Sequence, residues 1–401
     1  MGKKHILVIS QYFYPETFRI NDIATEWVKR GYKVTVVTGI PNYPEGKFYK
    51  GYGWFRNNRE IWNGIEIIRI PIIPRGSNSI GLILNYLSFV VSGFFWKCFT
   101  RIKTDYVFIF EVSPMTQALF GVWYARRRKI PCYIYVQDLW PENVQIAAGV
   151  NNKKILSAIG KMADYIYKRC TRIFVTSQSF AESVKARGVE EDKVIYWPQY
   201  AEEFYRPVPD KSSLISDDGI TNITFTGNIG TAQGLEILPE TAAALKKQDI
   251  RVRFNIIGDG RNKKNLINQI QEKQVDEYFN LVGWQPAEDI PSIISASDAA
   301  FLSFANNPLY SMTIPAKLQS YMACGIPIIG SVSGESERII TESNCGIVCK
   351  IGDYHDLAKA IKQFIDLSPE EKNRMVKNAE NYTKLHFNKS NLIDFIEDYF
   401  I

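Results

Sequence analysis

The stretch from Pro308 to Gly330, PLYSMTIPAKLQSYMACGIPIIG, reads as a loop, a helix, a glycine stop and a strand. Pro315 suits the first turn of a helix, where a missing backbone N–H loses no hydrogen bond. Gly325 directly follows the apolar run and suits a helix end. Because helix N-termini attract anions and Lys317 lies in the first turn, the stretch predicts a phosphate site. We therefore expect a nucleotide-like ligand here.

Short apolar runs alternate with helical segments on both sides of this stretch. The runs that we expect to be strands are residues 5–10, 33–38, 65–70, 106–110, 132–137, 172–176, 222–226, 251–257, 279–282, 299–303 and 326–330. This βαβ rhythm predicts an α/β fold in which parallel sheets carry helices on both faces.

The length of 401 residues indicates two domains, since single cores rarely grow past about 250–300 residues. Tyr196–Asp210 holds three prolines and little periodicity, so we interpret it as the linker. The first domain is expected over residues 1–198 and the second over 199–385, with a helix at 386–401 packing back on the first. Both domains should present ligand-binding loops where strands end, and a cleft between them is the default site.

The net charge of +6 is unevenly distributed. Residues 1–200 carry 28 Lys and Arg against 15 Asp and Glu, whereas residues 201–401 carry 20 against 27. A basic first half suggests a polyanionic partner, and nucleic acid or an anionic membrane would qualify. The basic residues are dispersed and no nucleic-acid motif is visible, so a nucleic-acid-binding module is the weaker alternative.

The six cysteines form no paired framework, and most lie in apolar runs, which indicates free thiols in a reducing compartment. Cys345 and Cys349 have no matching second pair and the three histidines are scattered, so no metal site is expected.

Ile80–Trp96, IGLILNYLSFVVSGFFW, is 17 residues long and carries no charge. Its length is at the short limit for a membrane span, and its polar residues and two glycines weaken that interpretation. A core helix that is buried or partly exposed, a helix in the membrane interface and a true span all remain open. No signal peptide precedes the first strand. We expect a cytoplasmic protein, peripheral on the inner membrane through this segment and its basic N-terminal domain.

Two glycine-rich loops follow strands in the second half. The first is Gly227–Gly234, GNIGTAQG, and the second is Gly258–Arg261, GDGR. Glycine lets backbone N–H groups approach phosphate closely. Neither loop has P-loop or dinucleotide spacing, and either alone could be a plain turn. Together with Lys317 they favour nucleotide binding.

Polar loops also follow strands in the first half. Asp138, in QDLWPEN, could orient a sugar hydroxyl, act as a base, or cap the helix that begins near Pro141. Glu16 lies in the first strand–helix loop. Asn42 and Glu111 lie at other strand ends, where they could face a substrate or only form turns.

These motifs together resemble the family-4 glycosyltransferases of the GT-B fold. The nearest branch is that of the fucosamine or fucose transferases of O-antigen, capsule and colanic-acid synthesis. The segments that carry the resemblance are Tyr14–Glu16, Gly39–Gly46, Gln137–Asn143, Gly227–Gly234, Gly258–Gly260 and Pro315–Pro327.

The resemblance implies two Rossmann-like domains that face a cleft. The second would bind a nucleotide-sugar, UDP-linked, whose sugar could be an N-acetylated 6-deoxyhexosamine such as FucNAc. The first would bind a lipid-linked saccharide acceptor at the inner face of the cytoplasmic membrane. Transfer would retain the anomeric configuration and need neither metal nor cofactor.

The resemblance and the loop chemistry together assign roles to particular residues. The expected catalytic residues are Asp138, Lys317 and Glu16. The expected donor-binding residues are Gly227, Asn228, Gly230, Gln233, Gly258, Gly260, Arg261, Gly283, Trp284, Pro315, Ala316, Leu318 and Ser320. The expected acceptor-binding residues are Thr17, Arg19, Asn42, Tyr43 and Glu111.

The chain departs from the wider family at five of its motif positions. Met312 and Ser320 stand where that family has glutamates. Asn228 and Gln233 replace an arginine and a lysine, and Gln137 replaces a histidine. Lys317 is then the obvious cation to stabilise a departing diphosphate, together with the amides of the first glycine loop. A nucleotide-sugar epimerase of the same fold and a non-catalytic sugar-nucleotide-binding protein are the alternatives.

Overall fold

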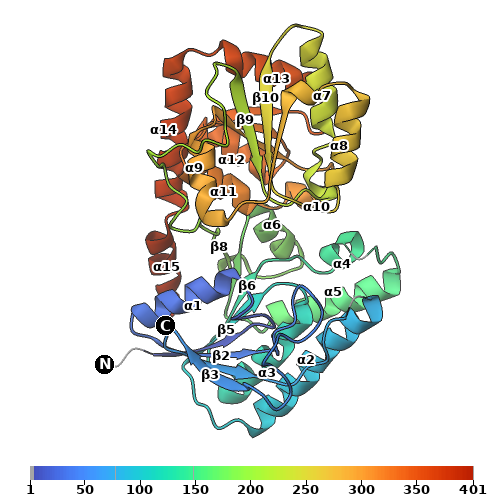
Figure 1. The fold of residues 1–401 in the computed structure, drawn as a ribbon. Coiled ribbons are helices and arrows are strands. Elements are labelled where there is room, and N and C mark those ends of the chain that lie inside the picture. The colour runs from blue at the N-terminus through green and yellow to red at the C-terminus, as the bar shows by residue number, and fades with distance from the viewer. Residues whose placement is uncertain (1–3, 77, 148, 401) are drawn as a thin grey trace. The chain divides into compact units, whose positions relative to one another are not determined.

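The computed structural model describes residues 4–76, 78–147 and 149–400 and divides into two compact units (Figure 1). The first unit extends to Trp197 and resumes at Glu397, and the second is Pro198–Ile396. The division falls inside the proline-rich segment that we interpreted as the linker. The sequence predicts that a helix at residues 386–401 packs on the first domain. The segment that groups with the first unit is shorter and begins at Glu397. Residues 1–3 and 401 of the expected segments lie outside the described residues.

The first unit is built on an eight-stranded sheet with the order β3-β4-β2-β1-β5-β6-β7-β8. Its strands are β1 (His5–Ile9), β2 (Lys33–Thr38), β3 (Arg59–Trp62), β4 (Ile65–Arg69), β5 (Tyr106–Glu111), β6 (Cys132–Val136), β7 (Arg172–Val175) and β8 (Val194–Tyr196). Every neighbouring pair is parallel except β3 and β4, which are antiparallel. The sequence did not predict β3 or β8, because β3 mixes charged and apolar residues and β8 is only three residues long.

Helices cover both faces of this sheet. They are α1 (Arg19–Lys29), α2 (Ser79–Phe99), α3 (Ala118–Arg128), α4 (Glu142–Ala147), α5 (Lys153–Tyr167) and α6 (Gln178–Ala186). The crossovers from β1 to β2 and from β5 to β6 run in opposite directions along the sheet. Because such crossovers are right-handed, α1 and α3 lie on opposite faces (Figure 1).

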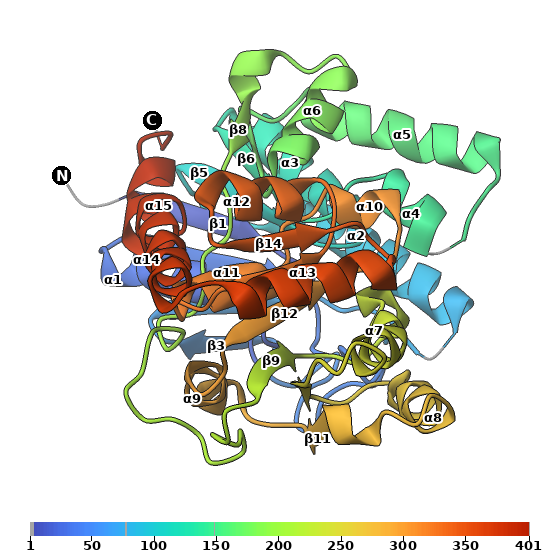
Figure 2. The same cartoon turned by 90° about the horizontal axis from the view of Figure 1, so that it is seen from above.

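The second unit has a six-stranded sheet with the order β11-β10-β9-β12-β13-β14, and all its strands are parallel. Its strands are β9 (Thr221–Thr226), β10 (Val252–Ile257), β11 (Phe279–Gly283), β12 (Ala299–Ser303), β13 (Ile328–Ser331) and β14 (Gly346–Cys349). Its helices are α7 (Ile237–Lys246), α8 (Lys263–Glu272), α9 (Ile290–Ser295), α10 (Pro308–Ser311), α11 (Ala316–Ala323), α12 (Glu335–Ser343), α13 (Tyr354–Asp366), α14 (Pro369–His386) and most of α15 (Lys389–Glu397). Figure 2 gives a second view of these elements.

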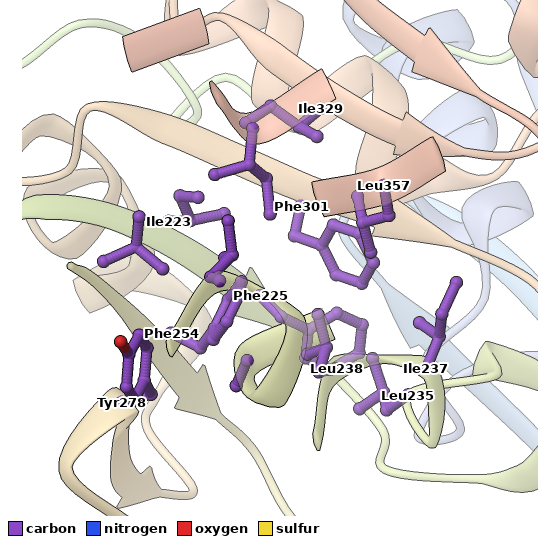
Figure 3. Packing of buried hydrophobic residues seen from close by; sticks show 14 of the residues in the cluster. Ile223, Phe225, Leu235, Ile237, Leu238, Phe254, Tyr278, Phe301, Ile329 and Leu357 are labelled. Carbon is purple, nitrogen blue, oxygen red and sulfur yellow. The ribbon is translucent and has the colours of Figure 1, made fainter. Parts of the chain in front are cut away.

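One side of the second sheet packs against α7 and α13. Phe225 and Phe301 project from neighbouring strands, and Leu238 and Leu357 come from the two helices (Figure 3). All four side chains are buried, so the apolar strand runs that predicted burial on both faces are confirmed here.

The stretch Pro308–Gly330 has the predicted order of elements. α11 begins directly after Pro315 and ends at Cys324, and Gly325 then takes a φ of +66° before the chain enters β13. A positive φ favours glycine, which is why this helix stops here. The short helix α10, in the turn-prone lead-in, was not predicted.

The sequence left three alternatives open for α2. Of its residues only Asn85, Phe89 and Gly93 are buried, so α2 is a partly exposed helix, which the first of those alternatives included. Among the described residues, α2 is one helix that is long and apolar enough to cross a membrane by length and composition alone.

All six cysteines are free thiols, and five of them are buried, as the sequence predicted.

Candidate active site

The two glycine-rich loops of the second unit are joined by backbone hydrogen bonds. The N–H of Gly227 donates to the carbonyl of Ile257 at 2.8 Å, and the N–H of Ile229 donates to the carbonyl of Asp259 at 2.8 Å. The N–H of Gly258 in turn donates to the carbonyl of Gly283 at 2.8 Å. The loops after β9, β10 and β11 are therefore held side by side at the carboxyl edge of the sheet, where α/β folds bind ligands.

Two glycines are required by this close approach of backbones. A Cβ on Gly258, whose φ is +142°, would overlap the carbonyl oxygen of Gly227. A Cβ on Gly260 would overlap the carbonyl of Ile229. Both glycines are therefore needed for the structure of the loops. The sequence had left this open, since either loop alone could have been a plain turn.

Lys317 lies beside the first of these loops, in the first turn of α11. Its Nζ donates a hydrogen bond to Oε1 of Gln233 and lies 4.2 Å from the centroid of the Phe225 ring. Burial lowers the pKa of Lys317 to about 7, and no carboxylate in the described part of the chain offsets this. A bound anion would restore the charge that burial disfavours. We call Lys317 and the loops Gly227–Gly234 and Gly258–Asn262 the glycine-loop cluster.

Two buried hydroxyl groups that the sequence did not single out hold this cluster in place. Tyr321 on α11 accepts a hydrogen bond from the backbone N–H of Thr226 at 2.9 Å, which attaches the helix to the end of β9. Ser303 at the end of β12 donates to the carbonyl of Gln233 at 2.6 Å. Tyr321 lies inside the Pro315–Pro327 segment, but neither hydroxyl has a chemical signature in the sequence, so only the three-dimensional structure could reveal their contacts.

The other predicted donor residues divide into two groups. Asn228, Arg261, Trp284 and Ala316 are exposed on or beside the loops, and Gly230, Gly283 and Pro315 are partly exposed along the same edge. Leu318 and Ser320 are instead buried, Leu318 completely within the hydrophobic core. One face of α11 packs on the sheet, which explains the burial of Leu318, and Ser320 is barely accessible; their roles in donor binding stay predictions.

In the first unit, Glu16 connects two loops. Its Oε1 accepts hydrogen bonds from the backbone N–H groups of Asn42 at 2.7 Å and Tyr43 at 2.6 Å. Burial raises the pKa of Glu16 to about 7, although the backbone donors oppose this shift. The carboxyl group thus ties the loop after β1 to the loop after β2.

The residues predicted to bind the acceptor near Glu16 differ in accessibility. Asn42 is fully buried and its amide is used internally, because Nδ2 donates to the carbonyl of Ile40 and Oδ1 accepts from the N–H of Arg75. A role of Asn42 in acceptor binding stays a prediction. Tyr43 and Thr17 are exposed, and the Tyr43 ring lies 5.2 Å from the Arg75 guanidinium. Arg19 begins α1 and is partly exposed.

Asp138 follows β6 and bridges to the loop after β5. Its Oδ2 accepts a hydrogen bond from the N–H of Ser113 at 2.7 Å. The hydroxyl of Ser113 accepts further hydrogen bonds from Trp140 Nε1 at 3.2 Å and Asn143 Nδ2 at 3.0 Å. The helix-cap alternative for Asp138 is not observed, since its carboxylate is directed to the neighbouring loop. Asp138 stays partly exposed and so can still meet a ligand.

Glu111 ends β5 and is completely buried. Neither of its carboxylate oxygens has a hydrogen-bond partner among the described residues. Burial, and then the negative charge of Asp138, raises the pKa of Glu111 well above its usual range. The side chain has no accessible surface in this structure, and its contact with the acceptor stays a prediction.

The helix α2 contributes to this region, which the sequence did not predict. Asn85 is buried and accepts a hydrogen bond from Gln11 Nε2 at 2.7 Å. Burial raises the pKa of the neighbouring Tyr86, and the charges of Arg75 and Asp138 both act on its hydroxyl. Tyr86 therefore lies within electrostatic reach of both groups. We call Glu111 and Asp138, with Tyr86 within electrostatic reach of Asp138, the carboxylate cluster.

In the described part of the chain, no three His, Cys, Asp or Glu side chains are grouped so that they could hold a metal ion.

A two-domain α/β fold with parallel sheets, whose ligand loops follow the strands, defines the GT-B class of glycosyltransferases. Two family models match the chain: "Glycosyl transferase 4-like domain" over residues 17–199 and "Glycosyl transferases group 1" over residues 210–382. The chain belongs to this glycosyltransferase family and is an enzyme that transfers sugar.

Two curated relatives are similar over most of their length. The chain is 25% identical over 340 residues to WcaI of Escherichia coli K12, a glycosyl transferase assigned to colanic acid biosynthesis, covering 80% of this chain and 81% of that protein. It is 22% identical over 373 residues to the alpha-monoglucosyldiacylglycerol synthase of Acholeplasma laidlawii, covering 87% and 89%.

Solved structures share the fold. Sucrose-phosphate synthase from Thermosynechococcus elongatus superposes with a TM-score of 0.76 at 16% identity, covering 99% of this chain and 98% of that one. Anabaena HepE in complex with UDP and glucose superposes with a TM-score of 0.68 at 15% identity, covering 99% of both chains. At these identities the likeness establishes the fold alone.

Proposed function

We propose that this enzyme moves a sugar from a UDP-sugar to a lipid-linked saccharide during synthesis of a surface polysaccharide, at the inner face of the cytoplasmic membrane. The main support for a nucleotide-sugar donor is the glycine-loop cluster. In this cluster Lys317 lies beside closely packed backbone amides and has no acidic partner among the described residues. UDP in HepE and the colanic acid assignment of WcaI support the donor class and the pathway class. The lipid product in the name of the Acholeplasma enzyme supports a lipid-borne acceptor.

In the proposed reaction the bond between the sugar C1 and the diphosphate oxygen breaks, and that oxygen keeps the electron pair. Lys317 and the amides of the first glycine loop stabilise the charge that develops there. A new bond forms between C1 and the acceptor hydroxyl, whose proton passes to the departing phosphate oxygen. Transfer on the same face of the sugar retains the anomeric configuration and requires no separate protein base.

We assign the acceptor to the first unit. Asp138 is the accessible carboxylate of the carboxylate cluster and would orient an acceptor hydroxyl. Glu16 would act as a positioning residue, since its carboxyl group holds the backbone of Tyr43. Exposed Tyr43 beside Arg75 offers an aromatic face and a cation to the saccharide or to its lipid phosphate.

A thermal-shift panel of UDP-, GDP-, ADP- and dTDP-sugars, including UDP-FucNAc, tests the donor. A ligand that binds the native state raises its apparent stability, so the UDP-sugars should raise the Tm and the others should not. A rise with GDP-sugars alone would overturn the choice of base. Conversion of the donor to its epimer without any acceptor would instead identify an epimerase, and binding without any turnover would identify a non-catalytic binder.

Substitution of Lys317 tests the role of the amine. Lys317→Ala should lower kcat by about 100-fold or more, the usual cost of removing one group that stabilises developing negative charge. The matched control is Lys264→Ala, since Lys264 is exposed on α8 next to the second glycine loop. Wild-type turnover in Lys317→Ala would refute the proposed stabilisation of the leaving group.

A further inference from the structure

The helix α2 has one narrow face that packs on the first unit. Its buried residues Asn85, Phe89 and Gly93 are spaced by four and therefore lie in one line along the helix. The Phe89 ring meets the Phe120 ring of α3 at 5.3 Å, and a Cβ on Gly93 would overlap that same ring. The contact with α3 is close, and it defines which side of α2 faces inward (Figure 1).

The opposite side of α2 is a continuous apolar stripe. Its large apolar side chains are between 43% and 80% exposed, and they are Ile80, Ile83, Leu84, Leu87, Val91, Phe94, Phe95 and Phe99. These residues follow helical spacing, and together we call them the α2 apolar face. Soluble monomers rarely expose contiguous apolar patches of this kind unless they contact a membrane or a partner.

The segment that carries the α2 apolar face is basic. Between Glu66 and Asp105 the sequence has no acidic residue. Lys97 lies 4.6 Å from the centroid of the Phe94 ring, so its charge sits directly at the margin of the apolar face.

The last turn of α3 adds cations at the same end of α2. Arg127 donates hydrogen bonds to the carbonyls of Lys97 and Cys98 at 3.3 and 3.2 Å, and Arg128 donates to the carbonyl of Thr100 at 3.0 Å. Arg75 stands close before the other end of the helix. An apolar stripe with cations at both ends matches an anionic bilayer surface, whereas two copies paired through α2 would bring like charges together.

Polar contacts on the inner side oppose insertion across the membrane. Asn85 Nδ2 donates to the carbonyl of Ile73 at 2.6 Å, and Ser88 accepts from the N–H of Ile73 at 2.9 Å. Ser92 donates to the carbonyl of Pro71 at 2.5 Å. A spanning α2 would break these hydrogen bonds and leave their polar groups unsatisfied in hydrocarbon, which costs several kcal/mol for each group.

We propose that the α2 apolar face inserts into the interface of an anionic lipid bilayer with the helix axis in the membrane plane. On its inner side the same helix contacts the loop after β1, because Asn85 accepts a hydrogen bond from Gln11 Nε2 at 2.7 Å. The biological purpose of this docking rests on the proposed function, since a lipid-linked acceptor would be delivered at the membrane surface. The contact itself can be tested without any sugar transfer.

Flotation with vesicles tests the apolar face. The full chain should bind vesicles of phosphatidylcholine with 30% phosphatidylglycerol, and the double variant Leu87→Glu with Val91→Glu should lose at least 10-fold in the partition coefficient. The matched control is Leu385→Glu, which places the same charge on an exposed leucine of α14 in the second unit. An unchanged Tm in each variant shows that folding is intact.

A second variant tests the contribution of the cations. Arg101 follows α2 and Arg126 lies in the last turn of α3, and both are exposed. Arg101→Ser with Arg126→Ser should weaken binding to the anionic vesicles by about 10-fold or more, with little effect on binding to pure phosphatidylcholine. Equal binding by the wild type and the Leu87→Glu, Val91→Glu variant would overturn the proposal. A wild-type dimer that the same variant dissociates would assign the face to a second copy, and resistance to alkaline carbonate extraction would show a span.

Sugar transfer distinguishes this proposal from the proposed function. If the variant loses vesicle binding but still glycosylates a water-soluble acceptor analogue, both proposals are supported. If the wild type binds vesicles through this face but no acceptor is glycosylated, the docking inference stands and the proposed function fails.

Discussion

The amine of Lys317 lies in a site where burial disfavours its charged form. Its neighbours are the amide oxygen of Gln233 and the ring of Phe225, which stabilise a cation less than a carboxylate would. A diphosphate would supply the missing negative charge, so donor binding and protonation of this amine should be coupled.

The first prediction is therefore a pH-dependent donor affinity. The pKa of Lys317 is near 7 in the free protein and a bound diphosphate would raise it. Binding must then take up a proton above pH 7, and the Kd for a UDP-sugar should rise by up to about 10-fold per pH unit between pH 7 and 8.5. Titration calorimetry measures this, and a UDP-sugar has no ionisable group of its own in that range.

The control is Lys317→Arg, because arginine stays charged throughout this range. Its Kd should be nearly independent of pH. A wild-type Kd that is equally flat between pH 6 and 8.5 would contradict the coupling.

A second prediction at this scale concerns Glu16. Its pKa is raised by burial from 4.5 to about 7, so the folded state favours the protonated acid. Its favourable contribution is complete below pH 4.5 and is lost as the pH rises through 7, and the loss amounts to about 3 kcal/mol. Glu16→Gln should remove this dependence while its carbonyl oxygen still accepts from Asn42 and Tyr43.

Urea unfolding of the two proteins at pH 5 and pH 8 provides the measurement. The stability of Glu16→Gln relative to the wild type should increase by about 3 kcal/mol between the two pH values. A difference that does not change with pH would show that Glu16 is not buried in its protonated form.

At the scale of elements, the loops after β9 and β10 are held together by backbone contacts that are too close to leave room for a side chain. Gly258→Ala should force the second glycine loop away from Gly227 and abolish donor binding, since the new methyl group would overlap a carbonyl oxygen. Loss of the Tm rise given by the donor is the measurement.

Gly219→Ala is the matched control for this substitution. Gly219 also has a positive φ, +81°, but a Cβ there would meet nothing within 4 Å. Gly219→Ala should lower the free energy of unfolding by about 1–2 kcal/mol, because alanine disfavours this backbone conformation, and it should keep donor binding. Equal donor binding by both variants would show that the contact between the loops is not needed for the site.

At the scale of the whole molecule, the chain leaves the first unit at Trp197 and returns to it at Glu397. Phe400 then packs on Trp27, Tyr106 and Tyr133, with ring centroids 5.3–5.6 Å apart, and its carbonyl accepts from the Tyr106 hydroxyl at 2.8 Å. The last residues of the sequence are thus part of the first hydrophobic core.

The corresponding prediction is that Phe400→Ala destabilises the first unit by about 3 kcal/mol, the usual cost of removing a buried aromatic ring. Phe55→Ala, at a phenylalanine that is 92% exposed, is the control and should change stability little. Urea unfolding monitored by tryptophan fluorescence measures both. A cost below 1 kcal/mol for Phe400→Ala would mean that the returning segment contributes little.

The sequence by itself determined the class of fold and the location of the loops. Continuous apolar runs such as residues 132–136 and 299–302 lie in β6 and β12, because strands buried on both faces need an unbroken apolar pattern. The glycine stop after α11 and the cation in its first turn were also readable, since they depend on local conformation and local charge alone.

Only the tertiary structure decided what each predicted side chain meets. It buried the side chains of Asn42, Glu111 and Leu318, and it left Leu87 of α2 half exposed. These outcomes depend on contacts between segments far apart in the chain, such as Phe89 with Phe120. A periodic apolar pattern can show that a helix has apolar sides, but packing alone determines which side is covered.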